Sequence, residues 1–451
     1  MLVKASIENF KSFDNATELT MVSSNKIRTN VNHRVKIKST QLLKYGVVYG
    51  ANAAGKTNLV EFFRFFKECV KNGIPIEATE LFCKNRKENQ IRESSFELQM
   101  TVGNKFYAYG FSAVLSQRCI TAEWLYELYQ NGSARRLFER EGNKRPILDE
   151  SITLTNAEKN KFDIYADDFE GNETFLFLSE MNRGKKYTEQ SKLLFFRDIY
   201  DWILSHIVII TPNTPLIDLE YYYDTDSLQL INRLIETFDT GISKVKIEEI
   251  TLDELSNAMP KPVFDKVMCH IKSKIEEQEH LSFKMTMRYN ENFFNIEAIG
   301  HSEPKVTTIR LNHVKSFFDF GFEEESDGTK RIFDLMDMLL SRRPDMLYVV
   351  DELERSLHPK LTERFLRLFM QLHNEEHVQL LFTTHESSIM DQSIFRRDEI
   401  WFIERNTENV SVIYSLDRFK ERYDKVLSKA YLDGRYGAIP VFGTFEFGEE
   451  E

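Results

Sequence analysis

The stretch GANAAGKT, residues 50–57, decides the fold that we predict for this chain of 451 residues. It matches the pattern G-x-x-x-x-G-K-[ST], whose small residues let backbone N–H groups surround a phosphate. An apolar strand is predicted before it, over 42–50, and a helix after it, over NLVEFFRFFKECV. Strand, glycine loop and helix follow one another in the order that a phosphate-binding loop requires. We therefore predict an α/β fold with a nucleotide site.

The chemistry of this loop assigns its residues to ATP and Mg²⁺. Backbone N–H groups and the positive end of the following helix would hold the β-phosphate. Lys56 would reach the β- and γ-phosphates, and the Thr57 hydroxyl would ligate Mg²⁺. The residues that we expect to contact the nucleotide are Gly50, Asn52, Ala53, Ala54, Gly55, Lys56, Thr57 and Asn58.

A second element, for the metal and for water, is predicted at LYVVDE, residues 347–352. Four apolar residues form a short buried strand, and two carboxylates follow it. Asp351 is placed to hold Mg²⁺, in its inner or outer shell, and Glu352 to polarise the attacking water as a general base. The alternative is a strand that merely ends in two solvent-exposed acids. The phosphate-binding loop in the same chain makes this alternative less favoured.

A third apolar strand, QLLFTT, ends immediately before His385. If this strand joins the same sheet, His385 lies near Asp351 and can sense the γ-phosphate. A structural role is the usual alternative for a single histidine. Glu352 and His385 are therefore the two catalytic candidates.

The stretch EEESDGTKR, residues 323–331, has two interpretations. It is a helix start, with Ser326 as the N-cap and Gly328 in the entry turn. The same Ser-x-Gly geometry also presents free N–H groups to a phosphate, as a site shared between two subunits requires.

Composition limits the remaining classes. The net charge is −12, which argues against coating a polynucleotide, although the basic stretch KIRTNVNHRVKIK, residues 26–38, could form a local basic face. The chain contains no apolar run of about 20 residues, and MLVKASIENF has no long apolar segment, so we expect no membrane contact and a cytoplasmic protein. The four cysteines lack ligand spacing, which favours separate reduced thiols.

Periodicity predicts three domains. Residues 1–150 would form the first half of the head, ending in an antiparallel lobe whose hairpin turns at Asn131-Gly132. Residues 151–304 would form a mixed α/β, largely helical insert, and residues 305–451 the second half of the head.

With its motifs in this order, the chain resembles the ABC-type ATPase superfamily. The superfamily's five motifs have counterparts here in the same order: GANAAGKT for the P-loop, ESDGT for the signature, LYVVDE for Walker B, ERSLHP for the D-loop and TTH for the switch. The chain is similar to the RecF/SMC/OLD branch in IENFKSF and GKTN. Within that branch it resembles RloA/AbiLi-type ATPases, in SDGTKR, DELERSLHP, TTHESS, RRDEIWFIER and DGRYGAIP. Members of this group, and the similar AriA ATPase of the PARIS system, act in bacterial anti-phage defence.

The resemblance implies a mixed sheet flanked by helices plus an antiparallel β lobe. It also implies a homodimer, with room for higher assembly, in which Ser326 and Gly328 complete the partner's ATP site. The expected partner is an effector encoded nearby, such as a TOPRIM-type or RloB-like nuclease. Asp327 replaces a glycine of the usual signature, from which we expect slow ATP hydrolysis.

Two functions are consistent with these motifs. The first is an ATP-dependent switch or scaffold that controls an effector in anti-phage defence. The alternative is a RecF-like ATPase in DNA repair or recombination, with nucleic acid bound by Lys26, Arg28, Arg34 and Lys36. The glutamine that usually senses the metal has no clear position, with Gln99, Gln117 and Glu123 as candidates.

Overall fold

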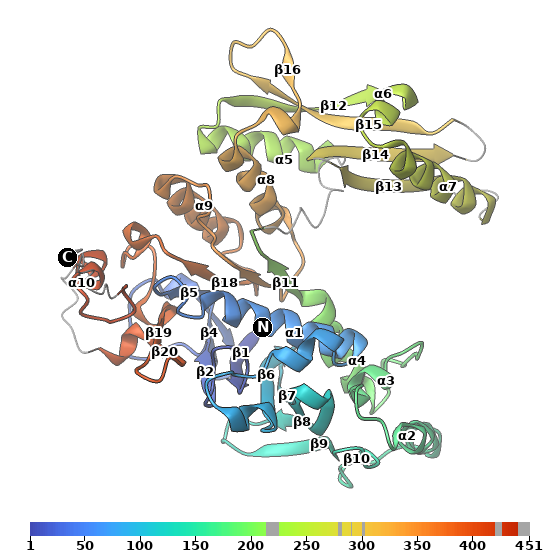
Figure 1. The fold of residues 1–451 in the computed structure, drawn as a ribbon, viewed down its shortest axis with the longest axis vertical. Helices are drawn as coiled ribbons and strands as arrows, with labels where there is room; N and C mark the ends of the chain where they lie inside the picture. Colours follow the sequence, from blue (N-terminus) through green and yellow to red (C-terminus); the bar gives the residue numbers. More distant parts are fainter. Residues whose placement is uncertain (213–224, 278–281, 290, 300–302, 420–425, 441–451) are drawn as a thin grey trace, which may run out of the picture. The chain divides into compact units, whose positions relative to one another are not determined.

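The computed structural model describes residues 1–212, 225–277, 282–289, 291–299, 303–419 and 426–440. The chain divides into two compact units (Figure 1). Unit 1 comprises Met1–Pro212, Arg343–Glu354 and His373–Glu451, and unit 2 comprises Asn213–Arg342 and Arg355–Leu372. Among the described residues, no helix has the length and apolar character that a membrane crossing requires.

The first sheet of unit 1 has the strand order β11-β17-β18-β5-β19-β20. All neighbours pair in parallel except β20, which runs antiparallel to β19. Its strands are β5 (Tyr45–Tyr49), β11 (Ile207–Ile210), β17 (Leu347–Val350), β18 (Gln379–Thr384), β19 (Ile400–Arg405) and β20 (Ser411–Ser415). Every residue of β5, β17 and β18 is buried, as expected for parallel strands covered on both faces.

The second sheet of unit 1 is antiparallel, with the order β10-β9-β8-β7-β6-β1-β2. Its strands are β1 (Leu2–Glu8), β2 (Thr17–Thr20), β6 (Ser94–Val102), β7 (Lys105–Val114), β8 (Cys119–Leu128), β9 (Ala134–Glu141) and β10 (Ile147–Leu148). Strands β8 and β9 pair across the Asn131-Gly132 turn, which confirms the predicted hairpin. A separate pair joins β3 (Arg34–Ile37) to β4 (Thr40–Leu43).

The helix after the P-loop, α1 (Lys56–Asn72), joins the two sheets through one apolar core. Phe62 and Phe66 pack from α1 against Phe96 and Phe111 of the antiparallel sheet. The same helix contacts β11 and β17. The remaining helices of unit 1 are α2 (Asn156–Phe169), α3 (Phe177–Glu180), α4 (Leu194–Asp201) and α10 (Leu427–Leu432). This shared core fixes the start of α1 beside the end of β5.

Unit 2 contains its own antiparallel sheet, ordered β12-β15-β14-β13, with β16 on β15. The strands are β12 (Ile242–Ile250), β13 (Ser282–Tyr289), β14 (Asn292–Ile299), β15 (Lys305–His313) and β16 (Asp319–Phe320). The helices are α5 (Thr225–Ile235), α6 (Leu252–Asn257), α7 (Lys261–Glu277), α8 (Asp327–Leu340) and α9 (Pro359–Leu372). Helices α6 and α7 cover the sheet over a core that includes Leu255, Ile271 and Ile296.

The boundaries of the two units differ from those of the predicted domains, 1–150, 151–304 and 305–451. Residues 151–212 belong to unit 1, because β11 adds a parallel strand to β17 and so enters the first sheet. Residues 305–342, with β15, β16 and α8, belong to unit 2. The mixed α/β head with a parallel sheet and an antiparallel lobe is the architecture predicted from the motifs.

Candidate nucleotide-binding site

The P-loop connects β5 to α1, and its glycines are required by close contacts. A Cβ on Gly50 would lie 2.4 Å from the Ile403 carbonyl oxygen of the neighbouring strand β19. Gly55 has φ +115°, and a Cβ there would lie 2.3 Å from Ser411 Oγ. Ala53 also takes a left-handed conformation, with φ +60°. The loop is therefore held tightly against the β19–β20 hairpin.

Hydroxyl and amide groups beneath the loop fix this conformation. Ser411 Oγ donates to the Ala54 carbonyl (2.5 Å) and lies 2.7 Å from Ser12 Oγ. Asn58 donates its Nδ2 to the same Ser12 hydroxyl at 2.7 Å. Asn58, expected at the nucleotide, thus also links α1 to the turn after β1. Ser12 and Ser411 are not among the residues predicted from sequence.

Replacing Gly55 with alanine is expected to lower the free energy of unfolding by about 3 kcal/mol. About 1 kcal/mol comes from the left-handed backbone, and the remainder from the collision with Ser411 Oγ. Denaturant midpoints measure the loss. Gly142→Ala is the matched control, since Gly142 has φ +55° and an added Cβ there would meet nothing within 4 Å. Equal losses in both variants would contradict a tight fit at Gly55.

Lys56 is buried at the start of α1 and points back at its own loop. Its Nζ donates to the carbonyl oxygens of Gly50 (2.7 Å) and Ala51 (3.0 Å), and lies 3.3 Å from His385 Nδ1. Burial lowers the pKa of Lys56 to about 8, although the carboxylates of Glu354, Asp351 and Glu352 oppose the shift. These carboxylates offset only part of the cost of burying the ammonium, so an anionic ligand beside Lys56 would be favourable.

Asp351 and Glu352 follow β17, as the sequence predicts. Thr383 of β18 fixes both residues. Its hydroxyl donates to Asp351 Oδ1 at 2.6 Å and accepts from the Glu352 backbone N–H at 2.9 Å. The Glu352 backbone is left-handed, with φ +48°, which turns its side chain to the edge where the P-loop lies.

His385 follows β18 and joins the lysine to the carboxylate. Its Nε2 lies 3.5 Å from Glu352 Oε1, and its backbone N–H donates to Glu354 Oε1 at 2.6 Å. Since the Lys56 ammonium can only donate to His385 Nδ1, the neutral ring carries its proton on Nε2, toward Glu352. The two predicted catalytic residues and the P-loop lysine therefore lie in one polar cluster.

These groups border a pocket of about 340 Å³ within unit 1. It is lined by Asn52, Ala53, Gly55, Lys56, Thr57, Asn58, Glu352, His385 and Arg405. Gly50 and Ala54, also predicted at the nucleotide, do not line this pocket, and Asp351 is buried next to Glu352. The donor set fits Mg²⁺, because hydroxyl and carboxylate oxygens such as those of Thr57 and Asp351 are its preferred ligands.

Two residues of this cluster are missing from the sequence prediction. Arg405, at the end of β19, donates from Nε to the Ala53 carbonyl (2.7 Å) and from Nη1 to Asn409. Glu354 accepts from the His385 backbone and opposes the lowered pKa of Lys56. Since β19 is parallel to β5, the strand pattern of IWFIER would have placed Arg405 at the same edge.

The candidates for a metal-sensing glutamine lie elsewhere in unit 1. Glu123 is fully buried in the antiparallel lobe, where it accepts from the backbone N–H groups of Phe177 (2.7 Å) and Leu178 (3.0 Å). Gln99 donates to Glu97, and neither Gln99 nor Gln117 lines the P-loop pocket. Glu123 is therefore a structural residue that joins α3 to the sheet.

Ser326 and Gly328 lie in unit 2, at the start of α8. Ser326 Oγ accepts from the Thr329 backbone N–H at 3.2 Å, which confirms the predicted N-cap. A Cβ on Gly328 would lie 2.7 Å from the carbonyl oxygen of Ser356, a residue with φ +62°. Gly328 of the ESDGT segment thus packs against Ser356 of the ERSLHP segment within this unit. Ser326 and Asp327 lie at the solvent-facing end of the helix.

Residues 47–391, from within β5 to beyond β18, match a family described as "AAA domain, putative AbiEii toxin, Type IV TA system" (AAA_21). The chain belongs to this family. Membership of AAA_21 makes it a P-loop ATPase, which implies ATP and Mg²⁺ as ligands and ATP hydrolysis as the activity. A comparison with curated proteins gives no match.

The solved structures that are similar to this AAA_21 chain include three SMC head domains. A crystal structure of an SmcHead bound to the C-winged helix domain of ScpA has 12% identity and a TM-score of 0.39, covering 92% of this chain and 97% of that one. The SMC head domain from Thermotoga maritima has 13% identity and a TM-score of 0.35, covering 92% and 98%. An Smc head domain with an extended coiled coil, bound to the C-terminal domain of ScpA derived from Pyrococcus furiosus, has 11% identity and a TM-score of 0.36. The match covers 92% of this chain and 96% of that one.

Arg405→Ala is expected to weaken ATP binding to this AAA_21 chain by about tenfold. The change removes a cation from the pocket and releases the Ala53 carbonyl, and a bond to a charged group contributes about 1.5 kcal/mol. Calorimetric titration with ATP and Mg²⁺ measures the change. Arg64→Ala, which removes a half-exposed arginine paired with Glu61 on α1, is the matched control. An unaltered affinity in Arg405→Ala would show that Arg405 only covers the loop.

Proposed function

We propose that the chain is an ATP-dependent switch in a bacterial anti-phage defence system, in which ATP closes two copies and thereby controls a partner effector. The family description names a toxin of a type IV toxin–antitoxin system, which supports a defence setting. The resemblance of SDGTKR, DELERSLHP and TTHESS to RloA/AbiLi-type ATPases supports the narrower assignment. The expected effector is a nuclease of the TOPRIM type or an RloB-like protein.

One observation supports the ATPase part of this proposal above all: Lys56, Glu352 and His385 meet around one pocket. A lysine that now donates to its own loop can turn its charge to the β- and γ-phosphates. Glu352 can take a proton from water, and His385, held between Lys56 and Glu352, can report whether the γ-phosphate is present.

The metal would be held by the Thr57 hydroxyl and, directly or through water, by the Asp351 carboxylate. Mg²⁺ supplies charge neutralisation of the phosphate oxygens when bound. The chain's own contribution is to keep Asp351 fixed through Thr383 and to keep Glu352 turned to the pocket. The Thr383 side chain thus serves both residues, through the Asp351 carboxylate and through the Glu352 backbone N–H.

The switch part of the proposal depends on the start of α8. Ser326 and the exposed N–H groups near Gly328 would bind the γ-phosphate of a partner copy's ATP, as in other ABC-type ATPases. Asp327 is favourable at a helix N-terminus but unfavourable beside a phosphate, which supports slow hydrolysis. A γ-phosphate contact across two copies couples ATP to closure, and further assembly of dimers could follow.

Co-expression with the products of neighbouring genes tests this function. A stable complex with a nuclease-like protein, and phage resistance that is lost in Glu352→Gln, is the expected result. A chain that purifies alone from such a strain and leaves phage plating unchanged would contradict it.

A second candidate function, DNA repair of the RecF kind, is favoured by one surface. Three residues of the predicted basic face, Lys26, Arg28 and Lys36, are exposed around the β3–β4 pair, and the fourth, Arg34, is partly buried. Lys38 adds a further exposed cation, and none of the four exposed residues has an ion-pair partner among the described residues. Duplex DNA would bind such a face with a steep dependence on salt. Reversing the charge of Lys26, Arg28 and Lys36 should then abolish DNA-stimulated ATPase activity, and unchanged stimulation would reject this alternative.

A further inference from the structure

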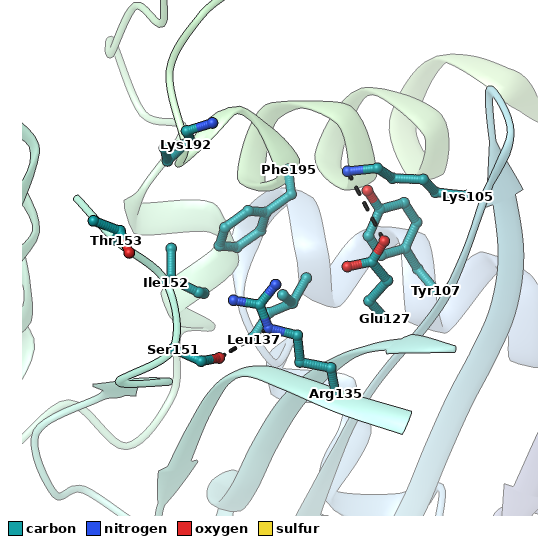
Figure 2. A pocket seen from close by; sticks show the side chains of 10 residues that line it. All are labelled: Lys105, Tyr107, Glu127, Arg135, Leu137, Ser151, Ile152, Thr153, Lys192 and Phe195. Atoms are coloured by element: carbon teal, nitrogen blue, oxygen red, sulfur yellow. Dashed lines mark hydrogen bonds and ion pairs between the residues drawn. The ribbon is translucent and has the colours of Figure 1, made fainter. Parts of the chain in front are cut away.

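A second pocket in unit 1, of about 330 Å³, lies on the antiparallel lobe, where β7 and β9 begin and β8 ends (Figure 2). Strands β7, β8 and β9 form its floor, the segment after β10 forms one side, and α4 covers it. It shares no lining residue with the P-loop pocket. Nothing in the proposed ATPase cycle uses it.

The side chains that line this pocket carry a net positive charge, in a chain whose net charge is −12. Lys105, Arg135 and Lys192 line it, against one carboxylate, Glu127, which lies 3.9 Å from Lys105. Arg135 donates its Nε to Ser151 Oγ at 3.0 Å, and this contact aims the rest of the guanidinium into the pocket (Figure 2). Within the described parts of the chain, neither Arg135 nor Lys192 has an ion-pair partner. The site is therefore suited to an anion.

The pocket also has apolar and aromatic lining, which comes from the covering helix α4, from the strands of its floor and from the segment after β10. The Phe195 ring points down from α4 toward the Arg135 guanidinium, with Leu137 and Ile152 beside it (Figure 2). A planar ring lying against Phe195 would bury apolar area that an inorganic anion cannot use. This wall favours an anion that carries a ring.

Hydrogen-bonding groups complete the pocket at the Glu127 end. Tyr107 is 3% exposed, and its hydroxyl has no hydrogen-bond partner among the residues described. Burial, reinforced by Glu127, raises the pKa of Tyr107, so its hydroxyl stays protonated and able to donate. Figure 2 shows this hydroxyl beside the Glu127 carboxylate and the Lys105 ammonium. A donor and an acceptor side by side suit a ligand with hydroxyl or amino groups.

We propose that this pocket binds a nucleoside phosphate. Arg135 and Lys192 bind the phosphate, the Phe195 ring stacks on the base, and Glu127 and Tyr107 bind the hydroxyl or amino groups of the nucleoside. The volume is at the small end of the range for ligand sites, about 300–1,000 Å³, which favours one nucleoside with one phosphate. The site is independent of the function proposed above, since none of its residues belongs to the P-loop cluster.

Titration calorimetry of the full chain with adenosine monophosphate tests the site. The Lys56→Ala background weakens binding at the P-loop, so that binding at the second pocket is measured by itself. We expect one binding event, weakened about tenfold by Arg135→Gln and about threefold by Tyr107→Phe, which keeps the ring but loses the hydroxyl. Arg86→Gln, a partly exposed arginine paired with Glu408, is the matched control and should leave the affinity unchanged.

Two further probes separate the parts of the ligand. Adenosine and inorganic phosphate should each bind at least tenfold more weakly than the monophosphate. Absence of binding, equal affinity in Arg135→Gln and its parent, or phosphate alone binding as tightly as the nucleotide would each overturn the proposal. Thermal unfolding without ligand checks that each variant is folded.

Discussion

Replacing Glu352 with glutamine is expected to lower ATP turnover at least about 100-fold and leave ATP binding intact. The amide keeps the size of the carboxylate and its place 3.5 Å from His385 Nε2, but it cannot accept a proton from water. Because ATP then persists, the proposed ATP-closed dimer should accumulate. Mass measurement should show 53.2 kDa without ATP and twice that mass with it.

The control for this variant is Glu408→Gln, which removes an exposed carboxylate of the same unit that is paired with Arg86. It should keep both turnover and mass behaviour. If Glu352→Gln loses turnover but its mass stays at one copy with saturating ATP, the catalytic assignment stands and closure by ATP is wrong. Unchanged turnover would remove Glu352 from the catalytic role itself.

Lys56→Ala is expected to weaken ATP binding by about 100-fold. The lysine is the buried cation of the pocket, and bonds from a charged group to phosphate oxygens contribute about 1.5–3 kcal/mol each. The variant should not lose stability without nucleotide, because burial already disfavours the charged amine, as its lowered pKa indicates. Thermal unfolding with and without ATP measures both effects.

In the parent, ATP should raise the unfolding temperature, and in Lys56→Ala this increase should disappear. Lys84→Ala, which removes an exposed lysine paired with Glu80, should behave as the parent. A marked loss of stability in Lys56→Ala without ATP would mean that the bonds from Nζ to the Gly50 and Ala51 carbonyls hold the loop together. The lysine would then be structural as well.

Sequence patterns are sufficient where a segment's own residues determine its structure. The apolar runs of β5, β17 and β18 are buried throughout, so their periodicity identifies them as central strands. The Ser326 cap and the Asn131-Gly132 hairpin depend on local geometry, and both are predictable. The grouping of Lys56, Glu352 and His385 follows from one rule, that parallel strands end at a common edge.

The features that could not be predicted from the sequence are those that depend on contacts between segments far apart in the chain. Strand β11 has only four residues, and nothing in IVII specifies that it pairs with β17 and not with the insert. Gly328 is required by the carbonyl of Ser356, and Gly55 by the hydroxyl of Ser411, which is far away in sequence. Arg405 reaches Ala53 only because β19 lies next to β5. These partners are chosen by the tertiary fold.

The place of β5 in its sheet has a consequence for newly made chains. Its two neighbours, β18 and β19, begin at Gln379 and Ile400, so the P-loop leaves the ribosome long before the strands that hold it. Such non-local pairing folds late. A chain cut short before Gln379 therefore lacks both strands that flank β5, and we expect such a fragment to bind nucleotide poorly.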